Sequence, residues 1–344
     1  MDTLTDESVL AAEHGTDQDD IVAKIEAAGE RVQRVHKAAG SVIFGQDQVI
    51  EQTLITVLSG GHALLIGVPG LAKTLLVETL GTVLGLNAKR IQFTPDLMPS
   101  DIIGSEVLED DGSAGARRSF RFIKGPIFTQ LLMADEINRA SPKTQSALLQ
   151  AMQEHHVTVA GQRHDIPQPF HVLATQNPLE QEGTYPLPEA QLDRFLLQVD
   201  VTYPDLAAER RMLFSTTGTA AQSLEPILSG PELMAIQRLV RQIPVPDKVV
   251  EAILQLVRSS RPGTGANAET DRLVAWGPGP RASQALMLAV RAKALIDGRL
   301  APSIDDVIAL AEPVLKHRMA LTFSARAEGE HISSIIKRLC AGLE

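Results

Sequence analysis

The sequence predicts an α/β domain built on a parallel five-stranded sheet and followed by a smaller all-α domain. Short apolar runs alternate with helical patterns as far as Pro204, which is typical of a parallel sheet covered by helices on both faces. Beyond Pro204 only helical patterns follow. The first apolar run leads directly into a glycine-rich sequence of the kind that binds phosphate.

The composition limits the classes of protein that the chain can represent. The 344 residues include 42 acidic and 32 basic side chains, with one Trp and two Tyr, which argues against a broad nucleic-acid surface. Cys340 is the only cysteine, so no internal disulfide can form. Because the sequence has no apolar run of about 18 residues and begins with acidic residues, we expect a cytoplasmic protein without membrane insertion.

The chain divides into three parts. Residues 1–20 are acidic with little apolar periodicity, and we expect a flexible tail there. Residues 21–204 form the α/β core, which opens with one helix from Ile21 to Gly40 and a second that ends before Gly60. Residues 205–344 form the helical domain.

The core is predicted to contain five strands and two hairpins. The strands are expected at residues 62–66, 90–93, 131–134, 172–175 and 196–201. Apolar runs on either side of turn residues predict the hairpins, at about 105–123 and 157–166, as insertions into the core.

Helical periodicity predicts six helices in the second domain. They are expected at about 206–216, 231–242, 246–258, 281–296, 303–317 and 331–340. Ser303 is a suitable N-cap because two aspartates follow it in the first turn.

Residues 67–74 read Gly-Val-Pro-Gly-Leu-Ala-Lys-Thr and are typical of a phosphate-binding loop. Glycines allow backbone N–H groups to surround phosphate oxygens, Lys73 adds a positive charge, and Thr74 offers a hydroxyl to Mg²⁺ at a helix N-terminus. Ala72 occupies the position where such loops usually have a second glycine. By itself this match is also compatible with chance or with a decayed site.

Two acids follow the strand at residues 131–134. Asp135 is positioned to reach a Mg²⁺ ion, and its neighbour Glu136 is a candidate base for activating water. The alternative is a strand that ends in two solvated acids.

Three further polar residues are candidates for the same chemistry. Asn177 follows the strand at residues 172–175, where an amide can hold a water or contact a phosphate. Arg194 precedes the last strand and is placed to complete a neighbouring subunit's site, although a surface ion pair with Asp193 is the alternative. Arg281 begins a helix, where a cation is unfavourable unless an anion such as phosphate lies opposite it.

Together these residues resemble the MoxR family of AAA+ ATPases, within the clade that carries a helix-2 insert, and the resemblance extends from about Ile21 to the C-terminus. Residues 67–74 resemble the Walker A motif, 135–139 the Walker B motif, 176–178 sensor 1, and 183–195 the signature ending in the arginine finger. In this family alanine at the position of Ala72 is usual. Pro280 to Ser283 resemble sensor 2, although Gly279 stands where the family more often has serine.

The resemblance implies an AAA+ P-loop NTPase fold with a helical lid, and ATP and Mg²⁺ as cofactors. It implies Glu136, Asn177, Arg194 and Arg281 as catalytic residues, and Thr74 and Asp135 as metal ligands. Nucleotide binding is expected at Val42, Phe44, Gly45, Gln46, Gly67, Val68, Pro69, Gly70, Leu71, Ala72, Lys73, Thr74 and Leu75.

The resemblance also implies a homo-oligomeric ring, commonly a hexamer, that works as a chaperone with a von Willebrand factor A domain protein and a protein client. Two alternatives stay open at this point. A nucleic-acid motor would use the basic residues of the inserts, which are Arg117, Arg118, Arg121, Lys124, Arg163 and His164, although the acidic balance disfavours it. A nucleotide-dependent scaffold with little hydrolysis is the other alternative, and the presence of Glu136 argues against it.

Overall fold

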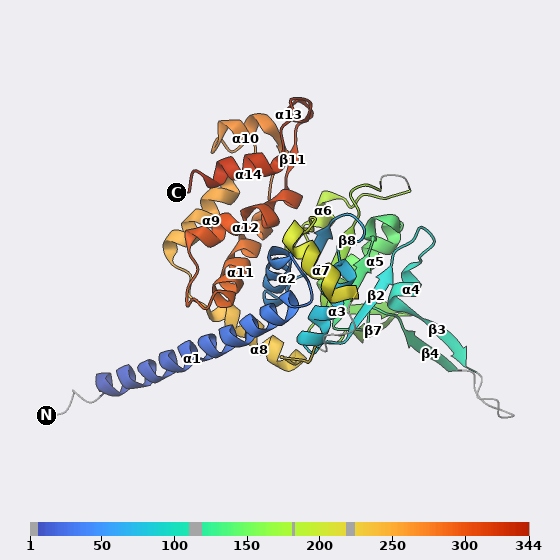
Figure 1. The fold of residues 1–344 in the computed structure, drawn as a ribbon, viewed down its shortest axis with the longest axis horizontal. Coiled ribbons are helices and arrows are strands. Elements are labelled where there is room, and N and C mark those ends of the chain that lie inside the picture. Colours follow the sequence, from blue (N-terminus) through green and yellow to red (C-terminus); the bar gives the residue numbers. More distant parts are fainter. Residues whose placement is uncertain (1–5, 110–118, 181–182, 218–223, 344) are drawn as a thin grey trace.

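The computed structural model describes residues 6–109, 119–180, 183–217 and 224–343. An α/β core and a helical C-terminal region lie side by side, and a long N-terminal helix runs along the lower side of the helical region and projects beyond it (Figure 1). Within these described residues, no helix combines the length and the apolar character needed to cross a membrane.

The central sheet has five parallel strands in the order β2-β5-β8-β1-β9. Their bounds are β1 Ala63–Ile66, β2 Ala88–Gln92, β5 Leu131–Asp135, β8 His171–Gln176 and β9 Leu197–Asp200. The parallel five-stranded sheet predicted from the apolar runs is confirmed.

Alternate residues of the strands supply two separate cores because successive side chains of a strand point to opposite faces of the sheet. Leu65, Met133 and Leu173 pack with helices α1 (Asp6–Gly40), α2 (Asp47–Leu58) and α3 (Lys73–Val83) and with the helical region. Leu64 and Leu132 pack on the other face, against helix α5 (Pro142–Glu154). The predicted arrangement of helices on both faces is therefore present.

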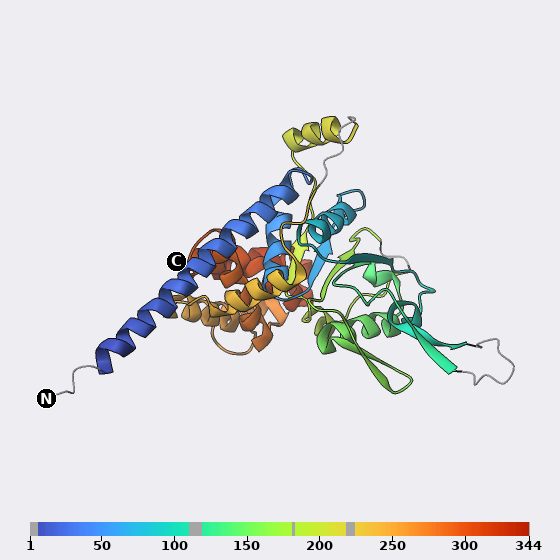
Figure 2. The same cartoon turned by 90° about the horizontal axis from the view of Figure 1, so that it is seen from below.

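Two antiparallel hairpins project from the same side of the core (Figure 2). The first pairs β3 (Gly104–Glu109) with β4 (Ser119–Lys124), after the short helix α4 (Pro99–Ile103). The second pairs β6 (His156–Val159) with β7 (Gln162–Asp165) across Ala160 and Gly161, both of which have positive φ. Positive φ at both central residues matches the twist of a two-residue hairpin turn.

The C-terminal region is helical, as predicted, but besides the six predicted helices it contains two short ones, α10 and α13, and a strand pair that the sequence analysis did not predict. Its helices are α7 Leu206–Thr217, α8 Gly230–Gln242, α9 Asp247–Ser259, α10 Ala268–Leu273, α11 Pro280–Ile296, α12 Ile304–Leu315, α13 Phe323–Ala327 and α14 Ile332–Cys340. A short antiparallel pair, β10 (Val274–Trp276) with β11 (Ala320–Leu321), also lies here. Segments of three and two residues are too short to show the alternation by which strands are recognised in a sequence.

The N-terminal helix is longer than predicted. Helix α1 begins at Asp6 rather than at Ile21 and ends at Gly40, so the expected tail is helical over residues 6–20, and residues 1–5 lie outside the described residues. This stretch contains no proline, the residue least compatible with a helix interior. Its N-terminal part extends away from the body of the molecule (Figure 1).

Candidate active site

Four strands of the sheet end at one edge, where their carboxyl ends bring polar residues together, as is general for parallel sheets. Strand β1 leads into residues 67–74, β5 ends at Asp135, β8 leads into Asn177, and β2 ends at Gln92. These segments surround a cavity of about 520 Å³, which is lined by Pro69, Gly70, Leu71, Ala72, Lys73, Thr74, Leu75, Arg90, Gln92, Asp135, Glu136 and Asn177.

The loop before helix α3 has the backbone of a phosphate-binding loop. Gly70 and Ala72 both have positive φ, of 84° and 56°, and Ala72 is the N-cap of α3. Gly67 is required for a different reason: a Cβ atom there would lie 2.6 Å from the carbonyl oxygen of Val201. The N-terminal N–H groups of α3 therefore face the cavity that the loop encloses.

Lys73 reaches back over the loop from the first turn of α3. Its ammonium group donates to the carbonyl oxygens of Gly67 and, at 3.2 Å, of Val68. Burial lowers the pKa of Lys73, and the nearby carboxylates of Asp135 and Glu136 act in the opposite direction. The charge is thus held above the loop, ready to neutralise an anion in the cavity.

Asp135 is 8% exposed and is fixed by two side chains that the sequence analysis did not identify. The hydroxyl of Thr175 donates to Oδ1 at 2.5 Å, and Nε of Arg90 donates to Oδ2 at 3.1 Å. The strand order explains both contacts, because β2 and β8 are the two neighbours of β5. A polar residue within a predicted buried strand was the only signal in the sequence for Thr175.

Glu136 has a left-handed backbone, with φ 54° and ψ 51°, and its N–H group donates to the Thr175 hydroxyl at 2.9 Å. Its carboxylate accepts from Nε2 of Gln92 at 2.6 Å and from Nη1 of Arg139 at 3.0 Å. A left-handed glutamate at the end of a strand is an uncommon conformation of the kind that clusters at functional sites. The two acids are thus hydrogen-bonded members of a cavity and not solvated strand-end charges.

A second cavity, of about 210 Å³, shares Pro69 to Ala72 and Leu75 with the first. Val42, Ile43, Phe44 and Gln46 line it, and it is completed by Tyr203, Pro204, Glu209 and Met212 at and beside helix α7. Gly45 does not line it but allows α7 to approach, since a Cβ atom there would lie 2.5 Å from Cβ of Ala208. The residues from α7 were missed because the sequence assigns them to the other domain.

The two cavities together form a site with a polar end and an apolar end. Of the thirteen predicted nucleotide-binding residues, Gly45, Gly67 and Val68 shape the backbone without lining either cavity. The polar end offers the N-terminus of α3, an ammonium group, a hydroxyl and a carboxylate, a donor set that fits a Mg²⁺-bound triphosphate.

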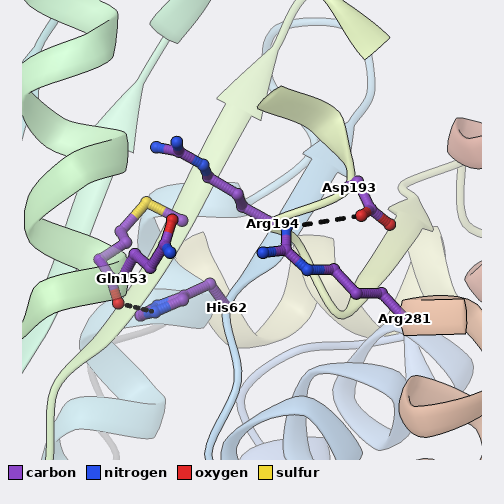
Figure 3. Close-up of a pocket in the computed structure, with 6 residues that line it drawn as sticks. His62, Gln153, Asp193, Arg194 and Arg281 are labelled. Atoms are coloured by element: carbon purple, nitrogen blue, oxygen red, sulfur yellow. Dashed lines mark hydrogen bonds and ion pairs between the residues drawn. The ribbon is translucent and has the colours of Figure 1, made fainter. Parts of the chain in front are cut away.

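Arg194 and Arg281 lie together in a third cavity, of about 170 Å³, which we call the arginine cavity (Figure 3). It has no lining residue in common with the first cavity, which we call the phosphate-loop cavity. His62, Met152, Gln153 and Asp193 complete the lining of the arginine cavity. Arg281 faces Asp193, with 3.5 Å between Nη1 and Oδ2, whereas Arg194 extends away from Asp193 (Figure 3). Of the described residues, none forms an ion pair or hydrogen bond with the Arg194 side chain.

The alternative considered for Arg194, a surface ion pair with Asp193, is therefore not formed. Asp193 instead pairs with Arg281 and with Arg318, which the sequence analysis did not single out. The anion opposite Arg281 at the start of α11 is this carboxylate, in the place where a phosphate was expected.

The histidines beneath this third cavity are uncharged. Burial lowers the pKa of His62 to about 3 and that of His171 to about 4. Nδ1 of His62 accepts from the Val172 N–H group at 2.9 Å, so Nε2 is the nitrogen that donates to the Met152 carbonyl. Their neutrality keeps further positive charge away from the two arginines.

The comparisons with known proteins agree with this architecture. Residues 62–197 match the model of the ATPase family associated with various cellular activities (AAA), and residues 266–339 match the AAA lid domain. The chain is 43% identical over 299 residues to the chaperone MoxR1 of Mycobacterium tuberculosis, covering 87% of this chain and 78% of that protein. The chain belongs to the MoxR family of AAA ATPases.

Other members of the family align over similar lengths. The protein MoxR of Paracoccus denitrificans is 31% identical, with 85% of this chain and 89% of that protein covered. The crystal structure of an ATPase from Cytophaga hutchinsonii, described there as putative, superposes with a TM-score of 0.85 at 35% identity, covering 95% and 97% of the two chains. The family resemblance and the AAA fold with a helical lid, both predicted from the sequence, are thereby confirmed.

Proposed function

We propose that this MoxR-family protein hydrolyses ATP with Mg²⁺ at the interfaces of a homo-oligomeric ring, a hexamer in our expectation, and uses the energy to remodel or mature a protein client in the cytoplasm. One observation carries the proposal: the phosphate-loop cavity and the arginine cavity of one subunit have no lining residue in common. Two cavities lined by different residues of one chain support a site that is completed between neighbouring copies.

In this proposal each cavity has its own task. Lys73 and the N-terminus of α3 bind the phosphates, Thr74 and Asp135 hold the metal ion, and Glu136 accepts a proton from the attacking water while Asn177 orients it. Mg²⁺ neutralises charge on the phosphates when bound. Arg194 and Arg281 of one subunit stabilise the charge that develops in the site of the next, a contribution worth about 10³ to 10⁵ in rate for an arginine supplied in trans.

The first hairpin favours a protein client over a nucleic acid. Its exposed apolar side chains include Phe120, 69% exposed, with Val107, Leu108 and Ile123. Arg121 of the same hairpin pairs with Glu109, and Arg163 of the second pairs with Asp165, so these cations are already neutralised. The name of the M. tuberculosis relative, a chaperone, agrees with client work, and a von Willebrand factor A domain protein is the partner we propose.

Mixing two inactive variants tests the shared site. Glu136→Gln subunits retain the arginines, and Arg194→Ala subunits retain the base, so mixed rings contain some interfaces with every group intact. We expect each variant alone to be inactive and the mixture to recover part of the ATPase rate. Arg194→Ala with wild-type turnover would refute the assignment of Arg194.

A nucleic-acid motor and a non-hydrolysing scaffold remain the competing functions. ATPase rates with and without DNA at two salt concentrations distinguish the motor, which should respond to DNA in a salt-dependent way. Single-turnover hydrolysis distinguishes the scaffold. Arg117 and Arg118, which the motor would use, lie outside the described residues.

A further inference from the structure

The buried side chain of Arg318 connects the helical region to the segment that carries Arg194. Arg318 follows α12 in the short 3₁₀ helix Lys316–Arg318 and is 2% exposed. Its Nε donates to Oδ1 of Asp193 at 2.7 Å, and Nη2 donates to the carbonyl oxygens of Asp193 at 3.3 Å and Phe195 at 2.7 Å. Nη1 donates to the carbonyl oxygens of Leu196 at 3.2 Å and Val314 at 2.6 Å.

These bonds use all five N–H donors that a guanidinium possesses. Three of them end on Asp193 and Phe195, the residues immediately before and after Arg194, and a fourth ends on Leu196. A buried arginine with every donor engaged is far more rigid than a surface ion pair, because each lost bond would leave a buried polar group unpaired. The backbone at Arg194 is therefore held from both sides by a residue of the other domain.

The two residues before Arg318 bond to the same stretch of the core. Lys316 pairs with the Asp200 carboxylate at the end of β9. Nε2 of His317 contacts the Phe195 carbonyl at 3.1 Å, and burial together with the charge of Arg318 lowers the pKa of this histidine, so the ring is neutral and Nε2 donates. Three consecutive residues thus bond to residues 193–200.

We propose that Arg318 positions Arg194, so that the orientation of the helical domain sets whether the arginine can reach the neighbouring site. The inference rests on the proposed function of Arg194. Asp193 connects Arg318 with Arg281, because its Oδ1 accepts a hydrogen bond from Arg318 while its Oδ2 faces Arg281, 3.5 Å away. A movement of the helical domain therefore displaces Arg194 and Arg281 together.

Arg318→Lys tests the proposal because lysine keeps the charge beside Asp193 but cannot span acceptors from Asp193 to Leu196. We expect a kcat lowered roughly 10-fold to 100-fold, as for a misplaced catalytic group, with unchanged affinity for a fluorescent ATP analogue. In an Arg194→Ala background the same substitution should change the small residual rate, measured by single-turnover hydrolysis at high enzyme concentration, less than about twofold, because the group that it positions is gone.

Arg299→Lys is the matched control. Arg299 is also an arginine of the helical region held by carboxylates, those of Asp297 and Asp306, but it does not contact residues 193–200. The Arg299→Lys substitution should leave kcat unchanged even if it lowers the melting temperature. Mixing Arg318→Lys subunits with Glu136→Gln subunits should restore activity, as Arg194→Ala subunits do.

The outcomes separate this inference from the proposed function. If Arg194→Ala is slow but Arg318→Lys reduces kcat by the same factor in both backgrounds, Arg318 is merely structural and the inference is wrong. If Arg194→Ala has normal turnover, the function of Arg194 fails first and the inference fails with it. Should Arg318→Lys not fold, His317→Ala removes one bond to the same segment, and it must show the same dependence on Arg194 with a smaller effect.

Discussion

The phosphate-loop cavity and the arginine cavity are built in different ways. The first is assembled within one domain from the ends of four parallel strands, and Lys73, Asp135 and Glu136 are each hydrogen-bonded inside it. The second lies where the core meets the helical region, and the Arg194 side chain there has no hydrogen bond or ion pair with any described residue. The first cavity thus holds its charged side chains in place by internal bonds, whereas the second presents, at Arg194, a charge that no described residue pairs with.

The largest expected effect on ATP affinity is at the phosphate-loop cavity. Lys73→Ala removes the ammonium group above the phosphate loop, and we expect ATP affinity to fall by at least about 100-fold, because a charge-assisted contact in a part-buried site is lost. Titration with a fluorescent ATP analogue measures the loss. The exposed Lys143→Ala, at the start of α5, is the control and should bind as the wild type does. Tight binding by Lys73→Ala would remove this cavity from the proposed site.

Arg281→Ala tests the arginine cavity and should affect the turnover rate rather than the affinity for ATP. We expect kcat to fall roughly 10-fold to 100-fold with little change in ATP affinity, because Arg281 lines a cavity that does not include the phosphate loop. Arg272→Ala removes an exposed arginine of the same domain that pairs with Glu328 at 3.7 Å, and it serves as the control. If Arg281→Ala weakened binding as strongly as Lys73→Ala, the division between the two half-sites would be wrong.

The buried side chain of His171 predicts how the stability of the fold responds to acid. The folded pKa of His171, about 4, lies below the unfolded value of 6.5, so between these values the unfolded chain binds a proton that the folded chain excludes. The free energy of unfolding should therefore be constant above about pH 6.5 and fall on acidification, by about 2 kcal/mol at pH 5 for this residue.

Urea unfolding of wild type and His171→Gln at pH 7 and pH 5 measures that contribution. Glutamine can still accept from Gln237, which lies 3.0 Å from Nε2 of His171, but it does not titrate. The loss of stability between the two pH values should be smaller in the variant by about 2 kcal/mol. An equal loss in both proteins would show that His171 is protonated in the folded state.

Sequence reasoning located the motif residues of the cavities but not the contacts between distant segments or the lining residues that those contacts bring in. The strands and the motif residues could be predicted because apolar runs and the glycine-rich loop are local signals. Arg318 and Thr175 were missed because their roles depend on which segments the fold brings together, and a buried arginine looks like any other arginine in a sequence. Tyr203 and Met212 were missed for a related reason: α7 packs on Gly45 and so contributes to a site in the other domain.

The smallest effect concerns Ala72, where the sequence departs from the general loop pattern. Its φ of 56° is a conformation that costs an L-residue about 1 to 2 kcal/mol, while glycine adopts it freely but loses more entropy on folding. Ala72→Gly should therefore raise the free energy of unfolding by less than about 1 kcal/mol, because the two effects oppose each other. ATP affinity should change by less than about threefold, since the loop keeps its backbone.

Ala160→Gly is the matched control, with φ 48° in the turn of the second hairpin, far along the chain from the phosphate loop. Chemical denaturation and nucleotide titration of both variants should give similar small gains in stability and no loss of binding. If Ala72→Gly alone weakened ATP binding more than about tenfold, the methyl group of Ala72 would hold the loop in its binding conformation. The alanine would then be a functional part of the first half-site, and the left-handed strain would be a cost that binding requires.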